Sequence, residues 1–508
     1  MTLQPLHSVR SVVTAVCASL LVLASLVFSV DGLEAGSPGD GGFYDPPDPL
    51  PAGPPGMVIR AEPFPVAPAG VRGWRVLYRS TRPDGSARAV SGVIFAPDEP
   101  AQAGGRPVVA WAHPTTGIAR RCAPSLLAPL LPSRIAGLTD LLARGYVVTA
   151  TDYPGLGTPS PHPYLIGESE GRAVLDSVRA AAQLPEAGAG RTYALWGHSQ
   201  GGHAVLFAGQ LAASYAPELR LVGIAAAAPP TDLATLFALN VESIVGRLLA
   251  AFAFVSWSEV YPDADYRHLV HAEAVPLIEA IARTCVRTTP GLLAAVLPAW
   301  QLGPDFLRRQ PQDVEPWRTL FAVNSPGAVP LGAPALIVQG TDDDIVWPWV
   351  TEAYVAARCR GGELVTLWLV PGLDHALAGQ VSAPGVAAWL ADRFAGLPVP
   401  DTCIVQQASL QTTARLEVAV LVHGGLPSRR RFGHSGKRAA DTRVPERGHQ
   451  EGAERPTALG DRCTIDRAWA VHAHRGCEAL HLGTHDRIAG RLRHGVPPWQ
   501  RHFPTDVF

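Results

Sequence analysis

A serine set between glycines is the first place in this chain where residue types and spacing favour covalent chemistry. Residues 193–204 read Tyr-Ala-Leu-Trp-Gly-His-Ser-Gln-Gly-Gly-His-Ala and contain the G-x-S-x-G pattern around Ser199. In this pattern a short buried strand turns sharply into a helix, and the serine hydroxyl projects from the top of a sheet. Side chains at Gly197 and Gly201 would collide with neighbouring backbone, so both glycines are required. The pattern alone is weak, but it predicts a nucleophile at Ser199 if a base and an acid follow.

A histidine must take the serine proton, because a hydroxyl near its ordinary pKa is a poor nucleophile. His375 is the predicted base, since it lies on a loop just after the apolar stretch 364–370. His198 and His203 are closer in sequence but worse placed. The first sits at the turn and points away from the serine's approach, and the second lies on the following helix. We expect both to line the pocket or to pack.

A carboxylate must hold the histidine in one tautomer and stabilise its charged form. Asp343 is the predicted acid, because it follows the buried stretch 335–340 with the spacing Gly-x-x-Asp-x-x-Val. Asp342 and Asp344 are expected to serve the turn or to cap the next helix. Asp374 directly precedes the predicted base and cannot easily turn to orient its ring. The order serine, aspartate, histidine is the one that α/β-hydrolases use.

Two hydrogen-bond donors must face the oxygen that becomes negative, each lowering the barrier by roughly 3 kcal/mol. The backbone N–H of Gln200, next to the nucleophile, is the first predicted donor. The second should come from the loop His113-Pro114-Thr115-Thr116-Gly117, which follows a predicted strand. We assign it to Thr116.

The elements that must position these residues alternate between strands and helices. Strand-like stretches span 74–81, 87–95, 107–112, 146–150, 221–228, 335–340 and 364–370, with helix-like stretches at 135–143 and 171–184 between them. This alternation predicts an α/β fold of the α/β-hydrolase type, with a mostly parallel central sheet and helices on both faces. Each proposed catalytic residue then follows the carboxyl end of its own strand, where open parallel sheets build their sites. A final helix over 385–394 should close the sheet.

The alternation of strands and helices ends at about residue 229. From there to about residue 330, apolar residues recur at helical spacing and no convincing strand is predicted. We interpret 229–330 as an inserted helical cap over the site, and the alternative is a separate buried helical subdomain with no gating role. Either arrangement places apolar surface near the serine and favours an acyl chain over a charged substrate. The predicted divisions are 1–35 as signal peptide or anchor, 36–58 as a Pro/Gly-rich linker, 59–228 and 331–410 as the two parts of the core, 229–330 as the cap, and 411–508 as a disordered tail.

Composition fits an exported globular enzyme. The 508 residues are 47% hydrophobic and carry a net charge of −2, which gives no sign of nucleic-acid binding. Residues 11–30 carry no charge, which predicts a signal peptide, with an uncleaved membrane anchor as the alternative. We therefore expect a secreted or extracytoplasmic protein. The sequence sets no oligomeric state.

Seven cysteines fit an oxidising compartment. Four of them, Cys122, Cys285, Cys359 and Cys403, lie in the predicted core and cap and allow three pairings, between which spacing does not choose. No C-x-x-C pair occurs, so neither a metal site nor redox chemistry is expected. No cofactor is implied.

Several motifs taken together resemble one known family. They are Gly197-His198-Ser199-Gln200-Gly201-Gly202, the 113–117 loop with Cys122-Ala123-Pro124-Ser125, Asp152-Tyr153-Pro154-Gly155-Leu156-Gly157, Leu175-Asp176-Ser177-Val178-Arg179-Ala180 and Gly340-Thr341-Asp342-Asp343. The set resembles the secretory lipase family of lipase A-like triacylglycerol lipases, over roughly residues 43–405. The resemblance implies a Ser-Asp-His triad, a cap with interfacial character, export, no metal, and the pairs Cys122–Cys285 and Cys359–Cys403. His198 departs from the tyrosine that is common in the family.

Hydrolysis of lipid carboxylic esters through an acyl-enzyme is the leading hypothesis, with a lipid or other ester as partner and contact with a lipid–water interface through the cap. The alternatives are an acyltransferase or peptidase on the same fold, or a secreted binding protein without catalysis, because a fold does not decide a substrate.

Overall fold

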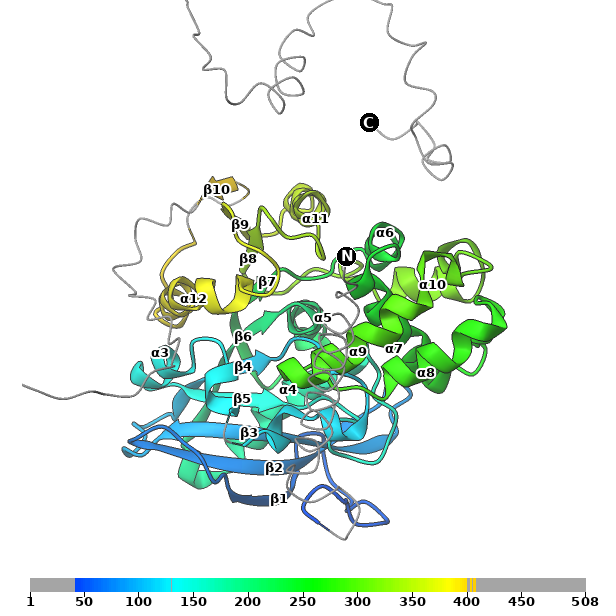
Figure 1. Ribbon diagram of the computed structural model, residues 1–508. Coiled ribbons are helices and arrows are strands. Elements are labelled where there is room, and N and C mark those ends of the chain that lie inside the picture. Colours follow the sequence, from blue (N-terminus) through cyan, green and yellow to red (C-terminus); the bar gives the residue numbers. More distant parts are fainter. Residues whose placement is uncertain (1–41, 129, 400–402, 404, 408–508) are drawn as a thin grey trace, which may run out of the picture. The chain divides into compact units, whose positions relative to one another are not determined.

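A computed structural model describes residues 42–128, 130–399, 403 and 405–407 (Figure 1). The predicted signal or anchor segment 1–35 and the predicted tail 411–508 lie outside these residues. Within the described part, no helix combines the length and the apolar character needed to cross a bilayer.

In the described part of the chain, ten strands form one sheet in the order β1-β2-β3-β5-β4-β6-β7-β8-β9-β10. The pairs β1/β2, β2/β3 and β3/β5 are antiparallel, and every other pair is parallel. This confirms the predicted mostly parallel sheet. The strands are β1 (Val58–Pro63), β2 (Val71–Thr81), β3 (Ala87–Pro97), β4 (Arg106–Ala112), β5 (Val147–Thr151), β6 (Ala189–His198), β7 (Arg220–Ala227), β8 (Ala335–Gly340), β9 (Val365–Val370) and β10 (Val405–Gln407).

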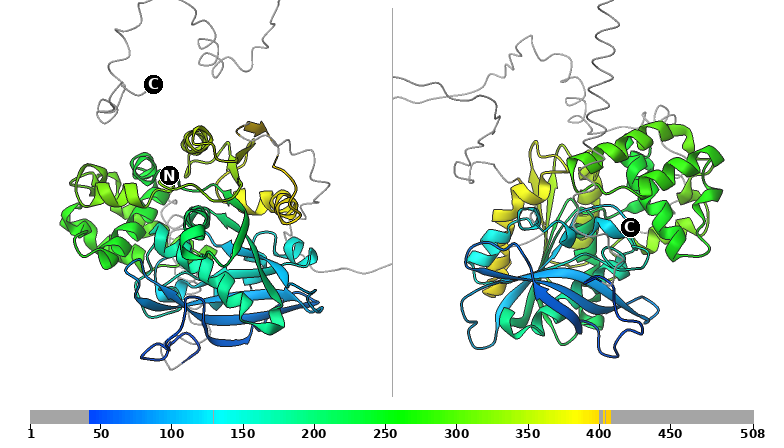
Figure 2. Two further views of the ribbon diagram at one scale, coloured as in Figure 1. Left: turned by 180° about the vertical axis from the view of Figure 1, so that it is seen from behind. Right: turned by 60° about the horizontal axis from the view of Figure 1, so that its bottom comes forward.

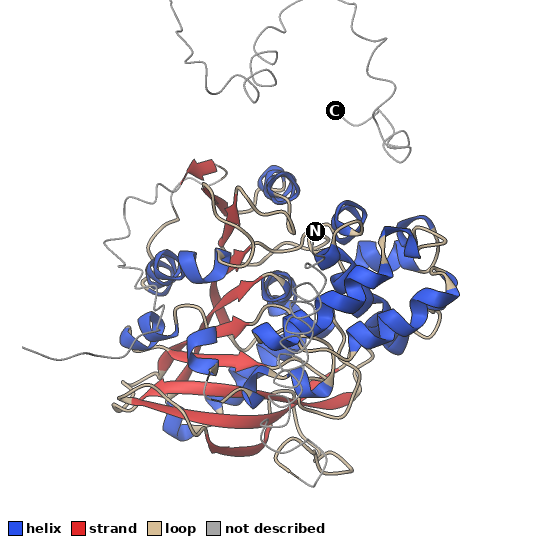
Figure 3. Ribbon diagram, in the orientation of Figure 1, coloured by secondary structure: helices blue, strands red, loops and turns tan. Residues whose placement is uncertain are grey.

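Helices cover both faces of this sheet, as Figure 3 shows, which also confirms the prediction. Helices α4 and α5 pack together on one face, whereas α3 and α12 pack on the other. The core helices are α2 (Leu131–Arg134), α3 (Leu138–Ala143), α4 (Gly167–Ala182), α5 (Gln200–Tyr215), α11 (Pro348–Arg360) and α12 (Ala378–Phe394).

The strand that carries the nucleophile is fixed from both faces. Side chains alternate along β6, so Tyr193 and Leu195 enter the core beneath α4 and α5, while Trp196 enters the core beneath α3 and α12. The indole N–H of Trp196 also donates to the carbonyl oxygen of Ala136 at 2.9 Å. Burial on both faces therefore holds the end of β6 in one position.

A second group of helices is inserted between β7 and β8 and has its own hydrophobic core. Buried aromatic side chains of this core include Phe252, Phe254, Trp257 and Trp317. Figures 1 and 2 show the group gathered at one side of the sheet. It comprises α6 (Leu233–Asn240), α7 (Ile244–Val260), α8 (Val275–Ala282), α9 (Thr289–Leu302) and α10 (Trp317–Val323). We call these five helices the cap, and their action as a lid stays a prediction.

Two expected helices differ from the structure. The helix expected over 135–143 begins only at Leu138, as α3, because Gly137 just before it adopts a left-handed conformation with φ 76°. The last helix begins at Ala378, seven residues before the expected start at 385, and contains Pro384 in its interior. Buried residues before the proline, among them Ala378, Gly379 and Ala383, hold the first turns of α12 in helical form.

The sheet also continues past the last helix, which was expected to close it. β10 pairs in parallel with β9, and Cys403 just before β10 is bonded to Cys359 of α11. At the other end, Tyr44 belongs to the expected linker, yet it is buried and its hydroxyl lies 2.8 Å from the hydroxyl of Ser125. This part of the linker is thus held against the core.

Candidate active site

The turn between β6 and α5 has the strained geometry that the glycine pattern predicts. Ser199 has φ 55° and ψ −118°, and its N–H donates to the carbonyl oxygen of Ala227 in β7 at 2.9 Å. A Cβ atom at Gly197 would lie 2.1 Å from the carbonyl oxygen of Gly201, and one at Gly201 would lie 1.9 Å from that of Ala112. Only glycine fits at either position, so the sequence fixes where the serine hydroxyl projects.

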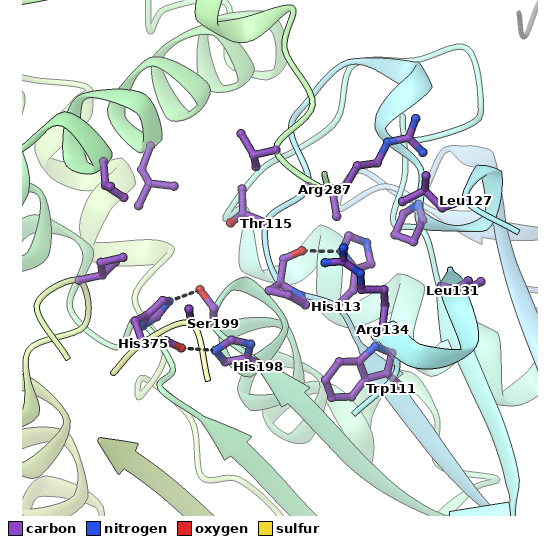
Figure 4. Close-up of a pocket in the computed structure, with 18 residues that line it drawn as sticks. Trp111, His113, Thr115, Leu127, Leu131, Arg134, His198, Ser199, Arg287 and His375 are labelled. Carbon is purple, nitrogen blue, oxygen red and sulfur yellow. Dashed lines mark hydrogen bonds between the residues drawn. The ribbon is translucent and has the colours of Figure 1, made fainter. Parts of the chain in front are cut away.

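The structure brings the predicted nucleophile, base and acid together. The Nε2 atom of His375 lies 2.9 Å from the hydroxyl oxygen of Ser199, and its Nδ1 atom lies 2.9 Å from Oδ2 of Asp343. Figure 4 shows the imidazole turned toward the serine. A neutral His375 that donates from Nδ1 to the carboxylate presents Nε2 as the acceptor for the serine proton.

Asp343 is held as a carboxylate by several donors. Oδ1 accepts hydrogen bonds from the backbone N–H groups of Ile345 and Val346 at 3.0 and 2.8 Å, and Oδ2 accepts one from the Gln339 side chain at 3.0 Å. Burial alone would raise the pKa of Asp343, but the hydrogen bond and charge of His375 together with the backbone donors lower the pKa below its ordinary value. Gln339 was not recognised from the sequence, where an amide inside a strand gives no functional signal.

Two of the three neighbouring aspartates have hydrogen bonds within local turns. Asp342 and Asp344 are exposed, and Oδ1 of Asp342 accepts a hydrogen bond from the Thr341 hydroxyl at 3.1 Å. Asp374 accepts the N–H of Leu377 at 3.0 Å, just before α12 begins. None of the three has a hydrogen bond to His375 among the described residues.

His198 lies closer to the base than the sequence suggested. It lines the same cavity as Ser199, and its Nε2 atom lies 2.9 Å from the carbonyl oxygen of His375. Burial, together with the charge of the His375 imidazole, lowers the pKa of His198 to about 4, so its ring is neutral and donates from Nε2. The residue before Ser199 is therefore bonded to the backbone of the predicted base, a contact between distant loops that sequence does not reveal.

One predicted oxyanion donor begins a helix, and the other offers a free hydroxyl. The N–H of Gln200 is the first of α5 and has no acceptor within the helix. Thr116 lines the cavity with Ser199, and its buried hydroxyl has no hydrogen-bond partner among the described residues. Its carbonyl oxygen is occupied by the N–H of Val286 at 2.9 Å. Their role at the oxyanion stays a prediction.

A buried polar network lies behind the nucleophile and was missed in the sequence. The fully buried Glu170 of α4 accepts hydrogen bonds from the Gln200 side chain at 2.7 Å and from His203 Nδ1 at 3.1 Å. His203 Nε2 in turn lies 2.7 Å from the carbonyl oxygen of Asn324, next to α10 of the cap. Since His203 faces this network and not Ser199, it packs, as expected.

The cap has further polar contacts with the loop before α4. The Ser256 hydroxyl of α7 donates to the carbonyl oxygen of His162 at 2.6 Å and accepts the N–H of Tyr164 at 2.9 Å. The indole N–H of Trp257 donates to the carbonyl oxygen of Tyr164 at 2.8 Å. Because these groups are buried, separation would leave them without partners.

Two cavities meet at Ser199. The wider one has a volume of about 280 Å³ and is lined by residues of the 113–116 loop, by His198 and by His375. The narrower one, of about 90 Å³, is lined mainly by residues of α6 and α7, with Trp257 and Phe321 also in its wall. Within the described residues, no group of His, Cys, Asp and Glu has the geometry of a metal site.

The described residues contain two disulfides, of which one lies beside the site. Cys122 is bonded to Cys285, which joins the loop after Thr116 to the segment between α8 and α9 of the cap. Cys359 is bonded to Cys403. These are the two pairs that the family resemblance implies.

With this geometry in place, comparison with known proteins gives the family. A family model described as "Secretory lipase" matches residues 134–402, more than half of the chain. The chain belongs to the secretory lipase family. That family supports lipid ester hydrolysis and an extracellular location.

Individual relatives agree with the family and add one contrast. A Mycobacterium tuberculosis protein named "Probable inactive lipase" is 28% identical over 387 residues, which span 72% of this secretory lipase and 84% of the relative. Lipase A of Arthroderma benhamiae is 26% identical over 397 residues, which span 72% of this chain and 81% of that one. The closed-state structure of Candida antarctica lipase A has a TM-score of 0.63 at 21% identity and covers 75% of this chain and 92% of its own, which shows the shared fold.

Proposed function

We propose that this secretory lipase cleaves lipid carboxylic esters through an acyl-enzyme formed on Ser199. The observation that carries the proposal is the pair of 2.9 Å contacts that link Ser199 to His375 and His375 to Asp343. Three groups in this order move a proton away from an attacking hydroxyl.

The reaction proceeds in two halves. The Ser199 oxygen attacks the ester carbonyl carbon while its proton passes to Nε2 of His375, and the carbonyl oxygen takes the negative charge beside Gln200 and Thr116. The carbon–oxygen bond to the alcohol then breaks, and the alcohol leaves with the proton from His375. A water gives a proton to His375 and attacks the acyl-serine, which releases the acid and returns the proton to Ser199.

The narrower cavity supports an acyl chain as the acid half. Its lining includes Leu233, Leu236, Phe237 and Leu249 and, among the described residues, no charged side chain. Each buried methylene contributes about 0.8 kcal/mol to binding.

Contact with a lipid–water interface through the cap is supported by one exposed face of α9. Leu293, Leu297 and Trp300 recur at helical spacing and are 56%, 57% and 62% exposed. Apolar side chains on one face of a surface helix favour adsorption to lipid. Secretion is supported by the family and by the two disulfides.

Binding without catalysis is a second candidate function, because one relative is named as an inactive lipase. In this chain the nucleophile, base and acid are all present and in contact, which favours catalysis. Acyl transfer or peptide hydrolysis would use the same three groups. Acyl transfer would differ only in the acceptor of the acyl group, and peptide hydrolysis only in the bond that is cleaved.

The test is hydrolysis of p-nitrophenyl octanoate by the enzyme and by Ser199→Ala. The variant should lose at least about a thousand-fold in kcat, and Ser214→Ala, exposed on the same helix, serves as the matched control. A fluorophosphonate probe should label the enzyme and not the Ser199→Ala variant. Near-normal activity of that variant would overturn the mechanism. A wild-type enzyme that neither reacts with the probe nor cleaves the ester would favour binding, and transfer of the octanoyl group to added alcohols in preference to water would favour acyl transfer.

A further inference from the structure

The two cavities that meet at Ser199 differ in charge. Among the described residues, the narrower cavity is lined by no ionisable acid or base apart from the Tyr164 hydroxyl. Among its described lining residues, the wider cavity has Arg134 and Arg287 and neither aspartate nor glutamate. The narrower cavity is thus apolar and the wider cavity is cationic, and Ser199 lies between them.

Arg134 is the accessible cation of the wider cavity. It is the last residue of α2, its side chain is exposed, and among the described residues it has no ion pair. Figure 4 shows it with His113 and Trp111 in the wall that faces the serine. Arg287 in the same wall is only 6% exposed, and its Nη1 donates to the carbonyl oxygen of Ala123 at 3.3 Å. Arg287 is therefore held in place, and Arg134 is the side chain that can reach a ligand.

The positive charge of the wider cavity comes from the arginines and not from its buried histidines. Burial lowers the pKa of His113, and it lowers the pKa of His198 to about 4. Both rings are neutral at pH 7, whereas an arginine keeps its charge at every pH at which the enzyme is folded.

We propose that the wider cavity binds the alcohol half of an ester whose alcohol carries a carboxylate or a phosphate, and that Arg134 recognises this negative charge. The inference rests on the proposed function, since it assigns the two halves of one ester to the two cavities. The acyl chain occupies the apolar cavity, where a charged group would lose its hydration without a partner. The guanidinium fork of Arg134 matches the planar oxygens of a carboxylate and the oxygens of a phosphate. A neutral alcohol would leave this cation without a partner.

The experiment compares matched esters that differ in one charge, at concentrations below micelle formation. Octanoyloxyacetate is paired with octanoyloxyacetamide, and 1-octanoylglycerol 3-phosphate with 1-octanoylglycerol. The measured quantity is the ratio of kcat/KM for the anionic ester to that for its neutral partner, compared between the enzyme and its variants. This comparison cancels the intrinsic reactivity of each ester.

Arg134→Gln should lower the ratio about ten-fold, chiefly through KM of the anionic ester, whereas Arg134→Lys, which keeps the charge, should lower it less. Arg144→Gln, an exposed arginine after α3 that does not line the cavity, is the matched control and should leave the ratio unchanged. Raising the salt concentration from 20 to 500 mM shortens the Debye length and screens the charge of Arg134. In the wild-type enzyme, the ratio of kcat/KM for the anionic ester to that for its neutral partner should therefore fall. If Arg134→Gln lowers the ratio for the carboxylate pair alone, or for the phosphate pair alone, the result identifies which anion the site binds.

Two negative outcomes are distinct. If the neutral esters are cleaved in a Ser199-dependent way but Arg134→Gln leaves both ratios unchanged, the inference is wrong and the proposed function stands. If the enzyme cleaves none of the four esters, the proposed function fails and the inference fails with it.

Discussion

The Nε2 atom of His198 donates a hydrogen bond to the backbone carbonyl oxygen of His375 across 2.9 Å. The two residues are 177 positions apart in the sequence, yet one hydrogen bond joins the turn that carries Ser199 to the loop that carries His375. Gly379 packs against the His198 ring, so no larger residue fits there without a shift. The distance between Ser199 and His375 thus depends on a side chain that takes no part in proton transfer.

His198→Ala should lower kcat about ten-fold with little change in KM, because the base loop loses its anchor while the substrate cavities remain. His198→Gln keeps a side-chain N–H donor and should recover most of the loss. Ester hydrolysis by both variants checks this prediction. A wild-type kcat in His198→Ala would show that the hydrogen bond does not position the base.

Asp343→Asn should lower kcat by roughly 10⁴, because the amide can donate to Nδ1 and favours the wrong imidazole tautomer. Asp344→Asn, one residue away and exposed, is the matched control and should stay close to the wild type. Steady-state kinetics with p-nitrophenyl octanoate measure both variants. Equal losses in the two would argue against Asp343 as the acid.

Acid should destabilise the fold through His198. Its pKa is about 4 in the folded protein and roughly 6.5 in the unfolded chain, so its contribution to stability is complete above pH 6.5 and is lost as pH falls toward 4. Between pH 7 and pH 4.5, His198→Gln should lose about 2 kcal/mol less of its free energy of unfolding than the wild type loses. Urea unfolding at the two pH values measures the difference, and parallel losses in both proteins would contradict the assignment.

Loss of the Cys122–Cys285 bridge should weaken both stability and activity. The bridge closes a loop of 163 residues, and its removal as Cys122→Ser with Cys285→Ser should cost about 2–5 kcal/mol. Activity should also fall, because Gly117, next to Thr116, pairs directly with Cys285. The matched control is removal of Cys359–Cys403, which should lower the unfolding temperature without a comparable fall in kcat.

The apolar face of α9 should raise the rate of hydrolysis only for aggregated substrate. Leu293→Ser with Leu297→Ser should lower hydrolysis of emulsified trioctanoylglycerol several-fold and leave that of dissolved p-nitrophenyl acetate near the wild-type rate. Leu397→Ser provides a control, because Leu397 is 54% exposed and lies after α12, outside the cap. An equal fall on both substrates would indicate damage to the cap and not a loss of interface contact.

Much of this site could be predicted from the sequence, because its chemistry restricts residue types, order and spacing. Glycine is required at 197 and 201 because a Cβ atom at either position would lie about 2 Å from a backbone oxygen, and both glycines are visible in the sequence. Gln339 and Glu170 could not be recognised, since a polar residue in a strand or helix has the same appearance whether it faces water or a buried partner. The start of α12 was placed too late for a related reason: burial of Ala378, Gly379 and Ala383 stabilises the first turns of the helix, and burial is a tertiary effect that the local sequence does not show.

The contacts of Ser256, Trp257 and Asn324 with the core restrict how the ester can enter. A rigid-body movement of all five cap helices away from the core would break the hydrogen bonds to His162, Tyr164 and His203 together. Several buried groups would then lose their hydrogen-bond partners. A local movement of α9 alone breaks none of these three, although it separates the Ala299 carbonyl oxygen from the Arg247 side chain that donates to it. We therefore expect ester and products to pass beside α9, while the helices that bond to the core stay in place throughout the catalytic cycle.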